Sequence, residues 1–159
     1  VYEIEKPGIF FDDDFILEAY PLRHGAPCLA YIFREKDKRK IEMNKIKKLG
    51  IVGKEIGFLQ NGGSVKIKDR IIIPEQVSYI KKGKKISIVL DTSYFKEIEY
   101  AVKDSDLLIS EATYSRELEE KASEHNHMTS EQAATIAKNA HVKKLFLTHL
   151  RFLVSQPPA

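Results

Sequence analysis

The fold of this 159-residue chain is indicated by an apolar run that ends in a carboxylate, Lys85-Ile86-Ser87-Ile88-Val89-Leu90-Asp91. Two similar runs follow it, at 107–109 and 144–148. Short runs of aliphatic residues are typical of strands that are buried on both faces of a sheet. Helical patterns lie between these runs, at 94–103 and 130–139. Strands that alternate with helices predict an α/β layered fold.

The residues before this region continue the pattern and then interrupt it. Two runs rich in aliphatic and aromatic residues, at 15–20 and 29–33, predict further strands. The segment 34–80 is irregular. It contains a short helical pattern at 44–49 that is closed by Gly50, a common helix stop. We therefore expect this segment to be organised differently from the rest of the chain.

Composition limits the class of protein. Hydrophobic residues make up 43% of the chain and charged residues 31%, which is typical of a soluble globular domain. No apolar run approaches the roughly 20 residues that a membrane span requires. The single cysteine excludes an internal disulfide and fits a reducing compartment. We expect a cytoplasmic protein without a membrane segment.

The net charge of +3 hides a strong segregation of charge. Residues 34–55 contain nine Lys or Arg against four Asp or Glu, whereas residues 97–124 contain three against nine. Two interpretations remain open for the basic stretch. Its lysines either keep an irregular segment in solution or contact the phosphate backbone of a nucleic acid.

Four predicted strands are followed by side chains that can bind a metal or transfer a proton: His24, Asp91, Glu111 and His149. In open α/β sheets, functional groups gather beyond the carboxyl ends of the strands. Zn²⁺ accepts mixed sets of imidazole nitrogen and carboxylate oxygen ligands. The pattern therefore indicates a metal site or an acid/base site at that edge.

Structural alternatives exist for each of these residues. Asp91 could cap the helix predicted at 94–103, and a single histidine after a strand is often structural. His125-Asn126-His127 precedes a helix whose start has capping-box spacing, Thr129 to Gln132. A histidine in such a loop is also placed to contact phosphate or to donate a proton.

Five motifs occur together in an order and at a spacing found in one enzyme family: His24-Gly25-Ala26-Pro27-Cys28-Leu29-Ala30-Tyr31, Asp91-Thr92, Ser110-Glu111-Ala112-Thr113, His127-Met128-Thr129-Ser130-Glu131-Gln132-Ala133-Ala134 and Leu147-Thr148-His149. They resemble ribonuclease Z, the tRNA 3′-processing endonuclease of the metallo-β-lactamase superfamily. The resemblance covers about Tyr2 to His149 and implies the αββα sandwich of that superfamily, with two zinc ions in a complete active site.

The resemblance also implies roles for individual residues. His24 would bind one zinc ion, His149 the other, and Asp91 would bridge both. His127 would donate a proton to the leaving 3′-oxygen, and Glu111 would orient it. The segment 34–80 matches the place where some family members insert a tRNA-binding arm, which gives Lys45, Lys47 and Lys48 a role in substrate binding.

The family's His-x-His-x-Asp-His motif is absent from this sequence. The resemblance therefore implies that residues 1–159 are the C-terminal half of one domain of a zinc-dependent endoribonuclease that removes 3′ trailers from precursor tRNA. The chain alone would be inactive, and the implied assembly is a homodimer. Two alternatives are another phosphodiesterase of the same fold and a non-catalytic RNA-binding relic. The tail 151–159 does not follow the family and is given no role.

Overall fold

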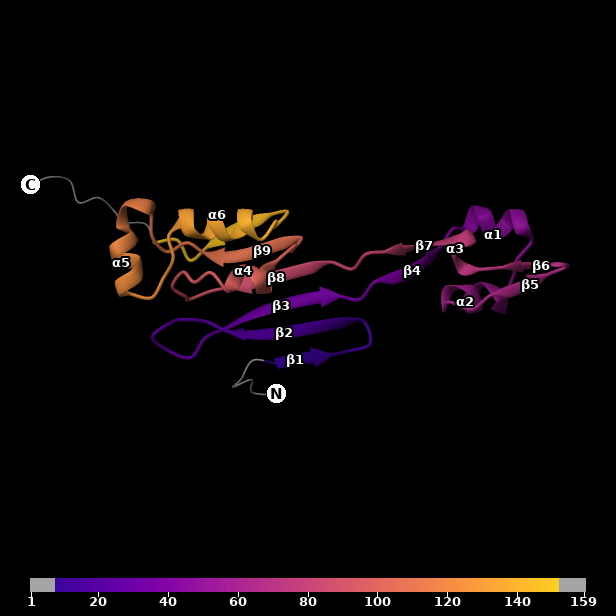
Figure 1. Ribbon diagram of the computed structural model, residues 1–159, viewed down its shortest axis with the longest axis horizontal. Coiled ribbons are helices and arrows are strands. Elements are labelled where there is room, and N and C mark those ends of the chain that lie inside the picture. The colour runs from indigo at the N-terminus through magenta and orange to yellow at the C-terminus, as the bar shows by residue number, and fades with distance from the viewer. Residues whose placement is uncertain (1–7, 152–159) are drawn as a thin grey trace, which may run out of the picture. The chain divides into compact units, whose positions relative to one another are not determined.

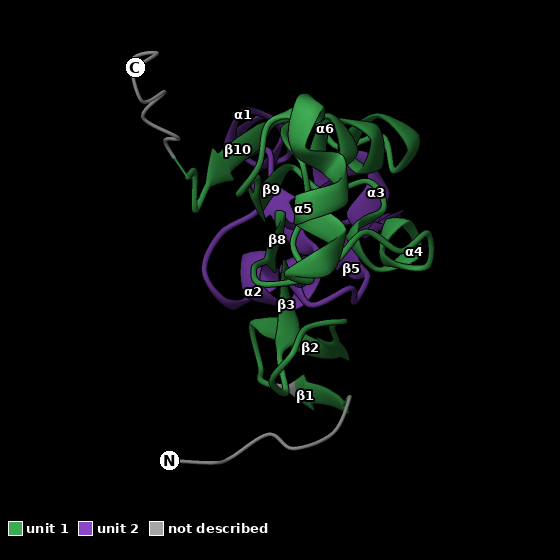
Figure 2. Cartoon of the chain, turned by 90° about the vertical axis from the view of Figure 1, so that its left-hand side faces the viewer, with its two compact units in different colours: residues 1–35, 84–159 green, residues 36–83 purple. Residues whose placement is uncertain are grey.

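The computed structural model describes residues 8–151, and the chain divides into two compact units. The larger unit comprises 1–35 and 84–159, and the smaller unit comprises 36–83 (Figure 2). Both units mix strands and helices, so the α/β class is confirmed. Among the described residues, no helix has the length and apolarity that crossing a membrane would demand.

The larger unit contains a six-stranded sheet in the order β1-β2-β3-β8-β9-β10 (Figure 1). Its strands are β1 (Gly8–Phe11), β2 (Phe15–Pro21), β3 (Leu29–Glu35), β8 (Lys85–Val89), β9 (Leu107–Glu111) and β10 (Leu145–Thr148). The first four pair antiparallel, and β8, β9 and β10 pair parallel. The strands predicted at 15–20, 29–33, 85–90, 107–109 and 144–148 are therefore confirmed.

One face of this sheet is covered by helices. The helical elements of the unit are α4 (Ile98–Val102), η1 (Arg116–Leu118), α5 (Glu119–Glu124) and α6 (Ser130–Asn139). Apolar residues of α4 and α6 form one core with Ala30, Ile32, Val89 and Leu108 of the sheet. The capping box at the start of α6 is confirmed, because the Thr129 hydroxyl accepts a hydrogen bond from the Gln132 main chain and the Gln132 side chain accepts one from the Thr129 main chain.

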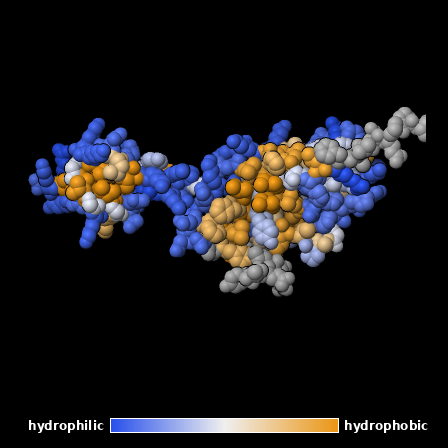
Figure 3. Space-filling view, turned by 180° about the vertical axis from the view of Figure 1, so that it is seen from behind, coloured by the Kyte–Doolittle hydropathy of each residue, from blue (hydrophilic) through white to orange (hydrophobic). Residues whose placement is uncertain are grey.

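The opposite face of the sheet is apolar. Side chains alternate between the two faces of a strand, so the neighbours of the buried Ala30 and Ile32 point to this second face. Tyr31 is 37% exposed there, and Phe146 on the edge strand β10 is 59% exposed. Figure 3 shows apolar side chains gathered on the surface of the larger unit.

The helix predicted over 94–103 is shorter than expected. It begins at Ile98, and its N-cap is Glu97. The preceding residues are held in a non-helical path, because the Ser93 N–H donates to the Arg23 carbonyl oxygen. The Arg23 guanidinium also lies 4.6 Å from the centre of the Phe95 ring. The interpretation of Asp91 as a helix cap is therefore wrong.

The smaller unit has a core of its own. It contains β4 (Lys38–Ile41), α1 (Met43–Leu49), α2 (Lys54–Gln60), β5 (Val65–Ile67), β6 (Arg70–Ile72), α3 (Pro74–Val77) and β7 (Ser78–Lys81). β4 pairs with β7 and β5 with β6, both antiparallel. Gly50 ends α1 with φ of 67°, a left-handed conformation that glycine adopts without steric cost. The core consists of Ile46, Ile51, Leu59, Val65, Ile72 and Val77.

Candidate metal centre

The three parallel strands place three polar side chains at one edge of the sheet. Asp91 comes two residues after the end of β8, Glu111 is the last residue of β9, and His149 follows β10 directly. Parallel strands have their carboxyl ends at the same edge, and this is where α/β sheets bind ligands. The parallel pairing therefore brings these residues together, as expected.

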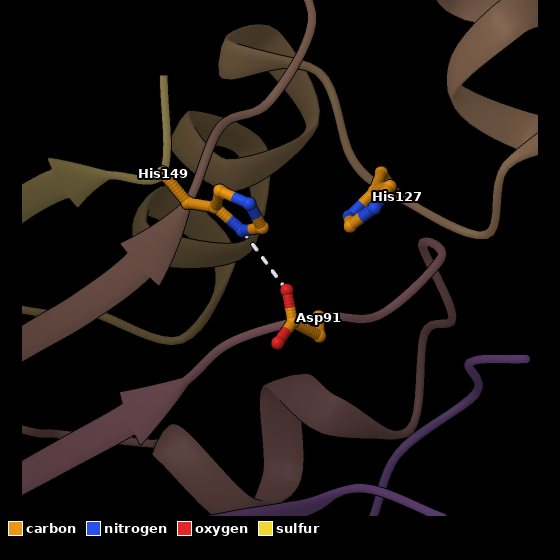
Figure 4. Close-up of side chains that lie close together, drawn as sticks. All are labelled: Asp91, His127 and His149. Atoms are coloured by element: carbon orange, nitrogen blue, oxygen red, sulfur yellow. Dashed lines mark ion pairs between the residues drawn. The ribbon is translucent and has the colours of Figure 1, made fainter. Parts of the chain in front are cut away.

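Asp91 and His149 are in direct contact. The Nδ1 atom of His149 lies 2.9 Å from Oδ1 of Asp91 (Figure 4), and both side chains are about half exposed. Both residues have left-handed backbone conformations, with φ of 52° for Asp91 and 55° for His149. Residues other than glycine adopt this conformation at some energetic cost, and such strain is concentrated at functional sites.

Two loops complete the site. His127 lies between α5 and α6, where its main-chain N–H donates to the Ala122 carbonyl oxygen. His24 lies between β2 and β3, and its Nδ1 atom is 3.1 Å from the Asn126 carbonyl oxygen. The rings of His24 and His127 have centres 5.0 Å apart, and those of His127 and His149 are 5.3 Å apart. The loops that precede β3 and α6 therefore meet at the ends of the parallel strands.

Three of these residues form a group that could hold a metal ion. One ligand atom from each of Asp91, His127 and His149 lies within 4.8 Å of the others (Figure 4). The resemblance named His24 as a ligand and gave His127 a different role. His24 is adjacent to this group through the His127 ring but is not a member of it. The assignment of individual ligands stays a prediction.

Glu111 is completely buried beneath this group. Its carboxylate lies 3.1 Å from His127 Nδ1 and accepts hydrogen bonds from the main-chain N–H groups of Thr92 and Met128. The Thr113 hydroxyl donates a further bond, at 2.8 Å. These partners come from the ends of three different elements, so the carboxylate links the Asp91-Thr92 turn to the loop that carries His127.

Sequence reasoning missed these partners of Glu111. Of the three partners, Thr113 alone uses its side chain, so Thr113 alone could have been proposed as a partner from the sequence. Thr92 and Met128 act through main-chain N–H groups, which carry no residue-specific signal.

The three lysines predicted to bind substrate are elsewhere, in the smaller unit. Lys45, Lys47 and Lys48 are exposed on α1, and Lys45 pairs with Glu42 at 2.7 Å.

No family model matches the chain. The ribonuclease Z of Nitrosopumilus maritimus is 40% identical over 149 residues, which are 92% of this chain and 50% of that protein. The ribonuclease Z of Methanocaldococcus jannaschii is 39% identical over 158 residues, again covering 50% of that protein. The resemblance to ribonuclease Z is confirmed. The chain spans about half the length of the curated relatives it matches.

Solved structures agree with the ribonuclease Z relatives. The short form of human tRNase Z is 25% identical, with a TM-score of 0.57, and the match covers 92% of this chain and 40% of that one. A metallo-β-lactamase fold protein of Bacillus subtilis, 18% identical, has the same TM-score over 96% of this chain and 42% of its own. The fold is therefore confirmed as part of a metallo-β-lactamase fold, of which this chain contains about half.

Proposed function

We propose that this chain supplies the C-terminal half of a zinc-dependent endoribonuclease that removes the 3′ trailer from precursor tRNA. The observation that carries the proposal is the contact of His127 with the buried Glu111, directly beside Asp91 and His149. Similarity to ribonuclease Z proteins over most of the chain supports it.

The donor set fits zinc. His24, Asp91 and His149 offer two imidazoles and a carboxylate, which are ligands that zinc accepts, and the side chains of Asp91 and His149 lie 2.9 Å apart. In this proposal Asp91, His149 and His24 would hold the zinc. Zinc bound there would activate a water molecule and stabilise charge that develops on the scissile phosphate. Three protein ligands do not fill two tetrahedral sites, so the remaining ligands come from the half that this chain does not span.

His127 is the proton donor in this proposal, and Glu111 is its positioning residue. Glu111 occupies the Nδ1 side of the ring, so a doubly protonated ring would keep its Nδ1 proton towards Glu111 and donate its Nε2 proton to the departing ribose 3′-oxygen. The products are a tRNA with a free 3′-hydroxyl and a trailer with a 5′-phosphate, because the bond to the 3′-oxygen is the one that breaks.

The smaller unit, 36–83, serves as the tRNA-binding arm in this proposal, which replaces the boundaries 34–80 expected from sequence. The exposed Lys45, Lys47 and Lys48 on α1 support this role by their charge. The predictions of a homodimer and of a cytoplasmic location stay predictions.

The deciding experiment combines this chain with the N-terminal half of the Methanocaldococcus jannaschii ribonuclease Z. We expect the assembled protein to bind zinc and to cleave a precursor tRNA directly before its trailer, and His127→Ala to abolish cleavage. A zinc-loaded assembly that leaves precursor tRNA intact would refute the proposed function.

A further inference from the structure

A pocket of about 390 Å³ opens beside the metal centre. It is lined by Thr113, Tyr114, His125, His127, His149, Leu150 and Arg151. Two of these residues, His127 and His149, belong to the proposed chemistry. Tyr114, His125 and Arg151 do not, and they form a connected cluster in the lining of the pocket.

Tyr114 is the centre of this cluster. The side chain is only 4% exposed, so its position is determined by the core. Its hydroxyl accepts a hydrogen bond from the Arg151 guanidinium at 3.2 Å, and the Arg151 main-chain N–H donates to the Thr113 carbonyl oxygen at 3.1 Å. Arg151 is exposed but is held at two points, which places its remaining guanidinium donors at the pocket.

His125 is held by the same tyrosine. Its ring is stacked on that of Tyr114, with centres 6.2 Å apart and planes 10° apart. His125 is itself exposed to solvent. Arg151 and His125 are thus two hydrogen-bond donors that share one rigid support, and holding donors in place before a ligand arrives lowers the entropic cost of binding.

The lining of the pocket selects for an anion. It contains an arginine, three histidines and two hydroxyl groups, but no carboxylate. A second pocket, which also includes His127, contains Glu119 and Glu120 and would repel an anion. Arginine matches the geometry of phosphate oxygens and can donate two parallel hydrogen bonds.

We propose that this pocket binds a phosphate group of the RNA strand adjacent to the scissile phosphate, through Arg151 and His125. This inference rests on the proposed function, because it takes the RNA strand to be the ligand. Binding there would direct the strand away from the acidic pocket on the other side of His127 and would hold the scissile phosphate at the metal centre.

Inorganic phosphate is a suitable first probe, used with the 159-residue chain in the presence of EDTA. The histidine ring signals, labelled with ¹³C, report binding by NMR. We expect the His125 signal to shift saturably and Arg151→Ala to weaken binding about tenfold or more, which is typical for a hydrogen bond between charged groups. Tyr114→Phe should weaken binding less, because it keeps the ring and removes only the hydroxyl. Arg23→Ala is the matched control, since Arg23 is an exposed arginine outside the pocket.

Unchanged phosphate affinity in Arg151→Ala, or a His125 signal that does not move, would overturn the inference. Arg151 is exposed and lies outside the core, so the variant should remain folded. This test measures binding without metal or cleavage, and its failure would therefore be distinct from failure of the proposed function.

A second arm of the experiment identifies which phosphate is bound. This arm uses the assembled enzyme and a precursor RNA with a neutral methylphosphonate next to the scissile bond. Wild-type enzyme should bind this RNA weakly. The loss of affinity should be about the same as the loss seen when the Arg151→Ala variant binds normal RNA. The two changes together should have little additional effect, because they remove the same interaction. Fully additive losses would show that Arg151 contacts a different group and would overturn the inference.

Discussion

Glu111 contacts His127 with both oxygens of its carboxylate, each 3.1 Å from the Nδ1 atom. The same carboxylate accepts main-chain hydrogen bonds from Thr92 and Met128 in two separate loops. A single buried side chain therefore determines both the orientation of the histidine and the distance between the loops that form the site.

Removal of this carboxylate should destabilise the larger unit. Glu111→Ala leaves the buried N–H groups of Thr92 and Met128 without a partner, and each unsatisfied group costs about 1–3 kcal/mol. We expect the free energy of unfolding in urea to fall by roughly 3 kcal/mol or more. Glu120→Ala, which removes an exposed carboxylate, should change it by less than about 0.5 kcal/mol. Equal effects of the two substitutions would contradict the role given to Glu111.

Metal content should separate ligands from the proton donor. In the assembled enzyme, Asp91→Asn should lose most of its zinc, because Asp91 is a zinc ligand in the proposed function. His127→Gln should keep its zinc and lose cleavage. Asp104→Asn is the matched control, since Asp104 also has a left-handed backbone, with φ of 57°, but lies outside the site. Elemental analysis measures the zinc content of all three variants. Zinc loss in His127→Gln would make His127 a ligand instead of the donor.

The 159-residue chain alone should not cleave precursor tRNA, and it should self-associate. In the proposed function its three ligands do not complete the zinc sites, and the sheet face that carries Tyr31 and Phe146 is apolar and exposed. Phe146→Lys places a charge on that face at the edge strand and should shift the chain towards monomer in sedimentation measurements. Tyr100→Lys is the control, because Tyr100 is 76% exposed on α4, away from the sheet. A monomeric wild-type chain at high concentration would refute this expectation.

The lysines of α1 should act on tRNA through charge. Replacing Lys45, Lys47 and Lys48 with alanine should weaken tRNA binding by the assembled enzyme. The slope of log affinity against log salt should fall by about 0.7–0.9 for each phosphate that the variant no longer neutralises. Hydrolysis of a small artificial phosphodiester should stay nearly constant. A control variant replaces Lys96, Lys121 and Lys138 of the larger unit with alanine. It removes the same charge and tests whether overall charge alone accounts for tRNA binding. An unchanged salt slope in the α1 variant would exclude these lysines from binding.

Asp106 should make stability depend on pH in acid. Hydrogen bonds from Lys143, from the Lys85 main chain and from Lys84 hold the pKa of its carboxyl well below the usual range. A depressed pKa in the folded state means that the stabilisation is present above the unfolded pKa, near 4, and is lost as pH falls below it. Asp106→Asn should lower stability by about 1 kcal/mol at pH 7, where exposure of the lysines limits the effect, and by less at pH 2. Urea unfolding at both pH values measures this, and an equal loss at both would show that the charge of Asp106 is not responsible.

Local signals in the sequence were sufficient for the main elements of the larger unit. The apolar run before Asp91 and the two that follow it became the parallel strands β8, β9 and β10, because each carries enough aliphatic surface to require burial on both faces. The start of α6 was equally predictable, since the capping box forms within four consecutive residues, Thr129 to Gln132. Parallel pairing then placed Asp91, Glu111 and His149 at one edge.

The tertiary structure alone decided the features that depend on contacts between distant segments. The helix after Asp91 begins late because Ser93 is bonded to Arg23, about seventy residues earlier, and local helix propensity cannot report such a contact. The sequence motifs named Glu111 and His127 but did not show that main-chain N–H groups complete the Glu111 site, since every residue except proline carries the same group. Arg151 showed no role in sequence, because its position in the pocket with His127 and His149 comes from Tyr114, and only folding brings that ring to it.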